Sequence, residues 1–192
     1  MFKKLSSPIK IQNYLDTLKM NWGETHMSPK MVLKAKKAHC FEGALLAAAA
    51  LLEHGERPLL LDLKTADDDD DHVVALYKRN GYWGAISKTN HASLRFRDPI
   101  YRTVRELALS YFHEYFINRG GKKVLRSYSR PFDLRKFGRE WINSENDLEY
   151  IAEVLDRSPH FPIVPKKNLK LIRPADKVER RAGEIVEWIK RH

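Results

Sequence analysis

One cysteine and one downstream histidine are the residues of this chain whose types and surroundings suit covalent chemistry. Cys40 is the only cysteine in the 192 residues. The apolar run 44–52, which is rich in Ala and Leu, follows it and predicts a buried helix with Cys40 at its N-terminal end. The helix dipole and free backbone N–H groups favour a thiolate there. Cys40 is therefore a candidate nucleophile; the alternative interpretation is a small buried hydrophobic residue.

A β-hairpin downstream supplies a candidate base. Residues 72–79 and 82–88 are rich in strand formers, and Asn80-Gly81 between them is the strongest short-range hairpin signal. With a two-residue loop, one face of the hairpin carries His72, Val74, Leu76, Trp83, Ala85, Ser87 and Thr89. We expect the apolar part of this face to pack on the Cys40 helix, which would bring Cys40 and His72 together. The alternative for His72 is a polar residue at the start of a strand.

The rest of the chain predicts elements that surround this unit. Ser7-Pro8 and Ser28-Pro29 are start signals for two N-terminal helices. The other expected segments are a strand over 57–64, a long helix from Asp98-Pro99 to Gly120-Gly121, a helix over 145–157, an extended stretch over 158–174 and a last helix over 175–191. The pattern predicts an α+β fold. We expect a single domain over 1–192, with its core at 38–120 and a C-terminal helical elaboration over 121–192.

Composition limits the partners. The hydrophobic share of 43% suits a globular protein, and we expect no signal peptide, no membrane segment and a cytoplasmic location. The net charge of +10 admits nucleic acid as a partner. The basic segment from Lys122 to Arg139, with its aromatic residues Tyr128, Phe132 and Phe137, is the place for such a surface. The alternative is a solvated basic loop with aromatic anchors.

No metal or cofactor is expected. The acidic run from Asp67 to Asp71 lacks the ligand spacing of a defined calcium loop, so a solvated loop is favoured. His39, His54, His91, His113 and His160 show no paired metal-ligand spacing.

The order of these motifs resembles the transglutaminase-like superfamily, which shares a core with papain-like cysteine peptidases. Cys40-Phe-Glu42-Gly-Ala44 is similar to the family's Cys-x-Asp/Glu-x-Ala pattern. The His72 strand, the turn and the Trp83 after it resemble the family's histidine strand. The resemblance covers about residues 38–90. It implies a Cys-bearing helix packed on a small antiparallel sheet, with Cys40 as nucleophile and His72 as base.

The third catalytic position departs from the family. The usual Asp falls on Ser87, which can hydrogen-bond an imidazole but supplies no negative charge. Asn90, a residue type that fills this role in papain-like enzymes, lies nearby, but the simple register places it on the other face. Ser87 and Asn90 are therefore both candidates for the third residue.

The resemblance implies a cysteine-dependent acyl-transfer or hydrolytic enzyme that acts on an amide, ester or thioester, with a peptide or protein as substrate and no cofactor. A second hypothesis is a catalytically degenerate domain of the same fold that binds a peptide or protein. It is suggested by Ser87, which stands where the family has a carboxylate. A third is a basic nucleic-acid-binding module.

Overall fold

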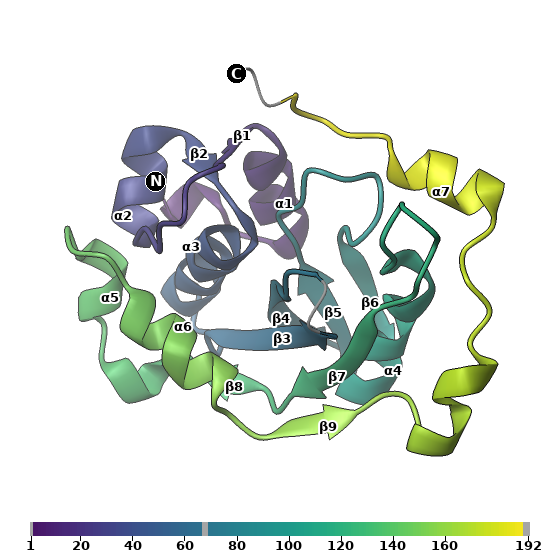
Figure 1. The fold of residues 1–192 in the computed structure, drawn as a ribbon. Coiled ribbons are helices and arrows are strands. Elements are labelled where there is room, and N and C mark those ends of the chain that lie inside the picture. The colour runs from purple at the N-terminus through teal and green to yellow at the C-terminus, as the bar shows by residue number, and fades with distance from the viewer. Residues whose placement is uncertain (1, 67–68, 190–192) are drawn as a thin grey trace.

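Figure 1 shows an antiparallel sheet with helices on both of its faces, in a computed structural model that describes residues 2–66 and 69–189. The strand order is β6-β5-β4-β3-β7-β9, and β8 also pairs with β3. The fold is α+β, as the sequence predicts. Asp67 and Asp68 of the acidic run and the last two residues of the expected C-terminal helix lie outside the described residues.

The sheet contains β3 (Leu59–Thr65), β4 (His72–Arg79), β5 (Tyr82–Ile86), β6 (Arg97–Tyr101), β7 (Leu125–Ser129), β8 (Phe132–Asp133) and β9 (His160–Pro162). A separate parallel pair is formed by β1 (Lys19–Met20) and β2 (Lys37–Ala38). The α-helices are α1 (Pro8–Asp16), α2 (Pro29–Ala35), α3 (Cys40–Glu53), α4 (Val104–Ser110), α5 (Glu140–Asn143), α6 (Glu149–Asp156) and α7 (Lys177–Gly183). Short 3-10 helices are η1 (Phe2–Lys4), η2 (Phe112–Glu114), η3 (Leu134–Phe137) and η4 (Lys166–Leu171).

Local signals place the N-terminal helices and the hairpin where the sequence predicts them. Ser7 and Ser28 cap α1 and α2, each with Pro at the first helical position. Asn80 and Gly81 both have positive φ, as a type I′ turn requires. β4 and β5 pair in the expected register, with Leu76 opposite Ala85.

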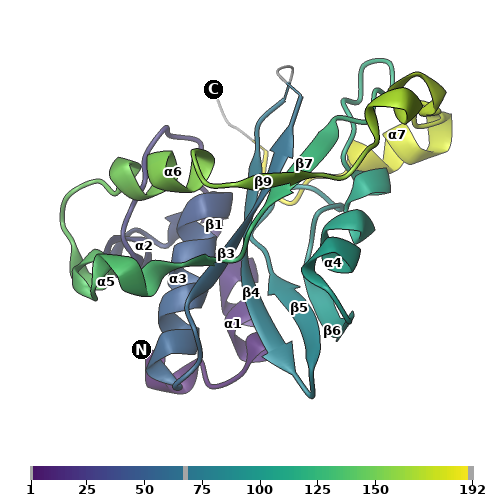
Figure 2. The ribbon, with the colours of Figure 1, turned by 90° about the horizontal axis from the view of Figure 1, so that it is seen from below.

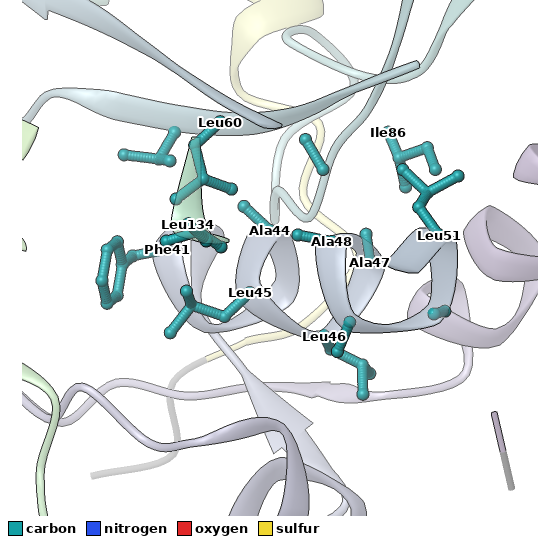
Figure 3. Close-up of a cluster of buried hydrophobic side chains, with 14 of the residues drawn as sticks. Phe41, Ala44, Leu45, Leu46, Ala47, Ala48, Leu51, Leu60, Ile86 and Leu134 are labelled. Atoms are coloured by element: carbon teal, nitrogen blue, oxygen red, sulfur yellow. The ribbon is translucent and has the colours of Figure 1, made fainter. Parts of the chain in front are cut away.

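The apolar helix α3 is the centre of the larger core cluster. Its residues from Phe41 to Leu51 are all buried. Figure 3 shows its Ala and Leu side chains beneath the sheet, with Leu60 and Ile86 pointing down onto the helix. A helix that is apolar on all sides needs cover on all sides. In Figure 2, α1, α2, α5 and α6 lie with α3 on one side of the sheet and complete that cover.

The hairpin packs on α3 with the face opposite to the predicted one. Val73, Ala75 and Tyr77 join the α3 cluster. Val74 and Leu76 lie in the second cluster, with residues of α4 on the other face of the sheet. The expectation that the Val74 face contacts the Cys40 helix is therefore wrong. Because β4 is buried on both faces, its apolar pattern is continuous and does not indicate which face a helix covers.

The expected long helix after Asp98 is also absent from the described chain. Residues Arg97–Tyr101 form the edge strand β6, and α4 begins only after the N-cap Thr103. Pro99 suits an edge strand because it has no N–H to donate. The basic segment expected as a loop contributes β7, β8 and η3. The last helix ends at Gly183, and residues 184–189 continue without regular secondary structure apart from an isolated bridge at Val186.

Candidate active site

Cys40 is the first residue of α3, and its thiol opens into a cleft. The cleft has a volume of about 730 Å³ and includes Cys40 and His72 among its lining residues. The Cys40 Sγ lies 4.0 Å from the carbonyl oxygen of Asp71, the residue directly before β4. The helix N-terminus therefore meets the start of the histidine strand, although the hairpin packs through its other face.

His72 is held by a directed chain of hydrogen bonds. The Ser87 hydroxyl has one proton, and it donates that proton to the Leu94 carbonyl at 2.6 Å. The Ser87 oxygen must therefore accept the 2.9 Å hydrogen bond from His72 Nε2. This leaves Nδ1 of neutral His72 without a proton, so Nδ1 is the basic nitrogen. Hydrogen bonding between Cys40 and His72 is one of the influences that stabilise the thiolate.

Ser87 is itself fixed by contacts with α1 and α3. The side chain of Gln12 accepts from the Ser87 N–H at 2.9 Å and donates to the Ser87 carbonyl at 2.8 Å. Beyond Ser87, the chain crosses α3 at Gly43, where a Cβ would stand only 2.4 Å from the Lys88 Cβ. The close approach at Gly43 therefore lets the segment after β5 lie directly on α3, and Gln12 sets its position.

A second histidine contacts the thiol. His39, the N-cap of α3, lies with Nε2 2.5 Å from the Thr25 carbonyl oxygen and 3.6 Å from a carboxylate oxygen of Glu42. Hydrogen bonding and charge interactions connect His39 to Cys40. The thiol thus interacts with two imidazoles, one supported by Ser87 and the other by Thr25 and Glu42.

The two histidines make Cys40 an unusually acidic thiol. Burial opposes the charged form, but hydrogen bonds and positive charge from His39 and His72 outweigh it and lower the pKa of Cys40 to about 5. Burial likewise opposes the imidazolium of His39, yet its interactions with Cys40 and Glu42 raise the His39 pKa to about 9. The site therefore favours a thiolate–imidazolium pair across neutral pH.

Glu42 is the carboxylate beside His39 in this site. Its side chain is 0% exposed. It accepts hydrogen bonds from the side chains of Asn21 and Thr25 and from the backbone N–H groups of Met27 and His39. Sequence analysis related Glu42 only to the family pattern and did not select His39 as a site residue. The signal was their adjacency to Cys40 in one helical turn, but only the loop at 21–27 determines where both side chains point.

The acidic segment closes one side of the cleft. Asp69 and Asp70 are exposed and line it, whereas Asp71 is half-buried and accepts from the backbone and hydroxyl of Thr65. Burial raises the pKa of Asp71. The Tyr115 hydroxyl donates to the Asp70 carbonyl oxygen, which ties this segment to the chain after α4. The segment is thus anchored close to the thiol at both Asp70 and Asp71.

Asn90 does not reach His72. Its side-chain amide pairs instead with the backbone of Trp188, accepting from the N–H at 2.8 Å and donating to the carbonyl at 3.0 Å. Of the four predicted site residues, the structure brings Cys40, His72 and Ser87 together and directs the Asn90 side chain to the end of the described chain.

One carboxylate cluster has the composition of a cation site. Asp62, Asp71 and Asp156 place oxygen atoms within 4.8 Å of one another. Lys64 already contacts Asp156 at 2.5 Å, and His160 contacts Asp62 at 3.0 Å. Two basic side chains therefore offset part of the charge, and we assign no metal to it.

The aromatic residues of the basic segment pack inward. Phe132 is buried, and Phe137 packs against the same core cluster. Tyr128 packs against the second cluster. These rings are therefore not free to stack on bases, so charge alone supports the nucleic-acid alternative.

No protein-family model matches the chain, and no curated protein matches it significantly.

Among the described residues, no helix has both the length and the apolar character needed to cross a bilayer.

Proposed function

We propose that this protein is a cysteine-dependent acyl-transfer or hydrolytic enzyme with a transglutaminase-like core at 38–120. The single observation that carries the proposal is the position of Cys40: its thiol stands at a helix N-terminus, interacts with two imidazoles and lines a cleft. A merely structural cysteine needs neither the polar support of His72 by Ser87 nor the buried anion beside His39. Perturbed titration of this kind is typical of functional sites.

The chemistry divides into two steps. The Cys40 thiol passes its proton to His72 Nδ1, and the resulting thiolate attacks the carbonyl carbon of an amide, ester or thioester to form a tetrahedral adduct. When the adduct collapses, the bond to the leaving group breaks, His72 Nδ1–H protonates that group, and a thioester remains on Cys40. Water or an amine then attacks the thioester, His72 takes a proton from it, and the acyl group leaves as an acid or an amide.

Backbone groups support the developing oxyanion. The first turn of any α-helix leaves N–H groups without intrahelical partners, and in α3 these groups belong to the turn that begins at Cys40. We assign this role to the backbone of the first turn of α3.

His39 and Glu42 compensate for the missing third carboxylate. Ser87 orients His72 but adds no charge to the site. The Glu42 carboxylate, 3.6 Å from His39, instead stabilises an imidazolium on the other side of the thiol. In this proposal His72 transfers protons, while His39 stays charged and keeps Cys40 ionised. A peptide or protein is the proposed substrate, and a reducing compartment such as the cytoplasm is the proposed location because the nucleophile must remain a free thiol.

A second candidate is a non-catalytic domain of the same fold that binds a peptide or protein. The observation that favours it is Ser87, because a neutral hydroxyl does not stabilise the imidazolium that acyl transfer requires of His72.

Trapping of an acyl-enzyme tests the proposal directly. The protein is mixed with p-nitrophenyl acetate at neutral pH and quenched in acid, and the mass of the Cys40 peptide is measured. We expect one acetyl group on Cys40 in the wild-type protein, with slower formation in His72→Gln and none on that peptide in Cys40→Ser. Acetylation at equal rates in wild type and His72→Gln would support the non-catalytic candidate.

A further inference from the structure

Residues 184–189 run from α7 along the chain segment that follows β5, and we call them the strap (Figure 1, the yellow end). Val186 forms an antiparallel bridge with His91. The Ala92 N–H donates to the Ile185 carbonyl at 3.0 Å, and the Glu187 N–H donates to the Asn90 carbonyl at 2.8 Å. The strap therefore sits on residues 90–92 as an added β-strand would.

Asn90 extends this pairing by one residue. Its side-chain amide meets both backbone groups of Trp188, at 2.8 Å and 3.0 Å. The edge at residues 90–92 thus presents the Ala92 N–H, the Asn90 carbonyl and both polar atoms of the Asn90 amide. These four groups recognise an extended backbone in one register and read no side chain.

Few polar side-chain contacts hold the strap in place. Ile185 is 61% exposed, and Ile189 is 83% exposed. The Glu187 carboxylate lies 3.4 Å from Arg95, and both groups are partly exposed. The buried indole N–H of Trp188 has no hydrogen-bond partner within residues 2–66 and 69–189. The edge accordingly binds the strap mainly through the strap's backbone N–H and C=O groups. Any extended peptide has the same groups.

The edge belongs to the same cleft as the thiol. Asn90 and His91 line that cleft together with Cys40 and His72, and Gly183, from which the strap departs, lines it as well. We propose that residues 90–92 form the binding site for the backbone of an extended peptide, and that the strap occupies this site in cis. That the peptide is the substrate rests on the proposed function; that it binds this edge does not.

Peptide binding to a full-length chain with a released strap tests the proposal. Glu187→Pro with Trp188→Pro removes the two strap N–H donors and leaves the edge intact. Val186→Pro is the matched control, because the Val186 N–H makes no hydrogen bond to a described residue. All chains also carry Cys40→Ser, so chemistry plays no part. The probe is a fluorescein-labelled hexapeptide with the sequence of residues 184–189, followed by fluorescence anisotropy.

We expect the released chain to bind the hexapeptide at least tenfold more tightly than the unreleased and Val186→Pro chains, because a tethered strap competes at an effective concentration on the order of millimolar. Asn90→Ala in the released chain should abolish this gain. A hexapeptide N-methylated at the positions of Glu187 and Trp188 should not bind. Equal binding to all chains, or binding of the N-methylated peptide, overturns the proposal.

Two measurements complete the test. In the wild-type protein, hydrogen exchange of the Ala92, Glu187 and Trp188 amides should be much faster than that of the α3 amides, because the strap opens; equal protection overturns the proposal even if the released variant does not fold. In a released chain that retains Cys40, saturating hexapeptide should slow alkylation of Cys40. Binding without protection overturns the assignment of this edge to the cleft, whereas failure of acyl-enzyme trapping leaves the peptide site intact.

Discussion

His72 donates through Nε2 to the hydroxyl oxygen of Ser87 at 2.9 Å. This hydrogen bond has only one possible direction, because the Ser87 hydroxyl donates its single proton to the Leu94 carbonyl oxygen. A neutral side chain therefore sets the tautomer of the histidine. The third residue of a cysteine site has two tasks, to orient the imidazole and to stabilise its charge. In this chain Ser87 performs the first, and the anion closest to an imidazole at the thiol is Glu42, on the other side.

The first prediction concerns the pH dependence of Cys40 alkylation. With the pKa of Cys40 lowered to about 5 and that of His39 raised to about 9, the thiolate forms as pH rises through 5, and the neighbouring imidazolium is lost only near 9. The rate with iodoacetamide should therefore rise with a midpoint near pH 5 and remain level to about pH 9. A stopped-flow or mass-spectrometric rate profile checks this. A midpoint close to the free-thiol pKa of about 8.5 contradicts it.

The second prediction separates the two histidines. His39→Gln should move the alkylation midpoint upward by about 1–3 pH units, because a charged neighbour is lost. It should slow acetylation at saturating pH much less than His72→Gln does, because the proton-transferring group remains. Rate profiles for both reactions in both variants check this. If His72→Gln alone shifts the midpoint and His39→Gln changes nothing, His39 has no role at the thiol.

Ser87 provides the third prediction. Ser87→Ala removes the acceptor for His72 and should slow acetylation by about 10- to 100-fold, the equivalent of one hydrogen bond to a charged group. Ser87→Asp should not raise the rate above wild type, although it restores the family residue. An aspartate cannot donate to the Leu94 carbonyl, now 2.6 Å from the Ser87 oxygen, and would be repelled by it. Faster acetylation by Ser87→Asp would show that charge, not orientation, is missing.

A fourth prediction concerns Gln12, which positions Ser87 from α1. Gln12→Glu keeps the shape of the side chain but replaces the amide donor to the Ser87 carbonyl with an oxygen. We expect slower acetylation, with the alkylation midpoint of Cys40 nearly unchanged, because His39 is unaffected. The comparison of the two profiles is the readout. A parallel shift of both would indicate general destabilisation rather than loss of positioning.

The last prediction concerns Glu42. Glu42→Gln replaces a buried acceptor of hydrogen bonds from Asn21, Thr25, Met27 and His39 with a group that brings its own N–H donors. Unfolding free energy should fall by about 2–5 kcal/mol, as measured by urea denaturation. In the folded fraction, Cys40 should also be alkylated more slowly at low pH, because His39 loses the negative charge of Glu42. Unchanged stability would mean that the carboxylate is not required by the 21–27 loop.

Several features of this protein follow from short stretches of sequence. Ser7-Pro8 and Ser28-Pro29 start helices because the cap and the fixed proline φ act locally. Asn80 and Gly81 accept positive φ, so the turn and the register of β4 with β5 follow from two residues. The apolar run after Cys40 is helical and buried, and the thiol is at its N-terminus. The contact between His72 and Ser87 agrees with the face predicted from that register.

Long-range packing decided what these signals leave open. Asp98-Pro99 lies in an edge strand rather than at the start of a helix because this segment pairs with β5. β4 is buried on both faces, so its sequence alone does not state which face receives α3.

The sequence by itself therefore determined that a cysteine begins a buried helix and that a histidine begins the next hairpin. The tertiary structure alone decided that a second imidazole, that of His39, interacts with the thiol and is paired with the buried carboxylate of Glu42. It also decided that Asn90 binds the strap. The reason is physical: caps and turns depend on neighbouring residues, whereas the direction of the His39, Glu42 and Asn90 side chains depends on partners contributed by residues 21–27 and 184–189.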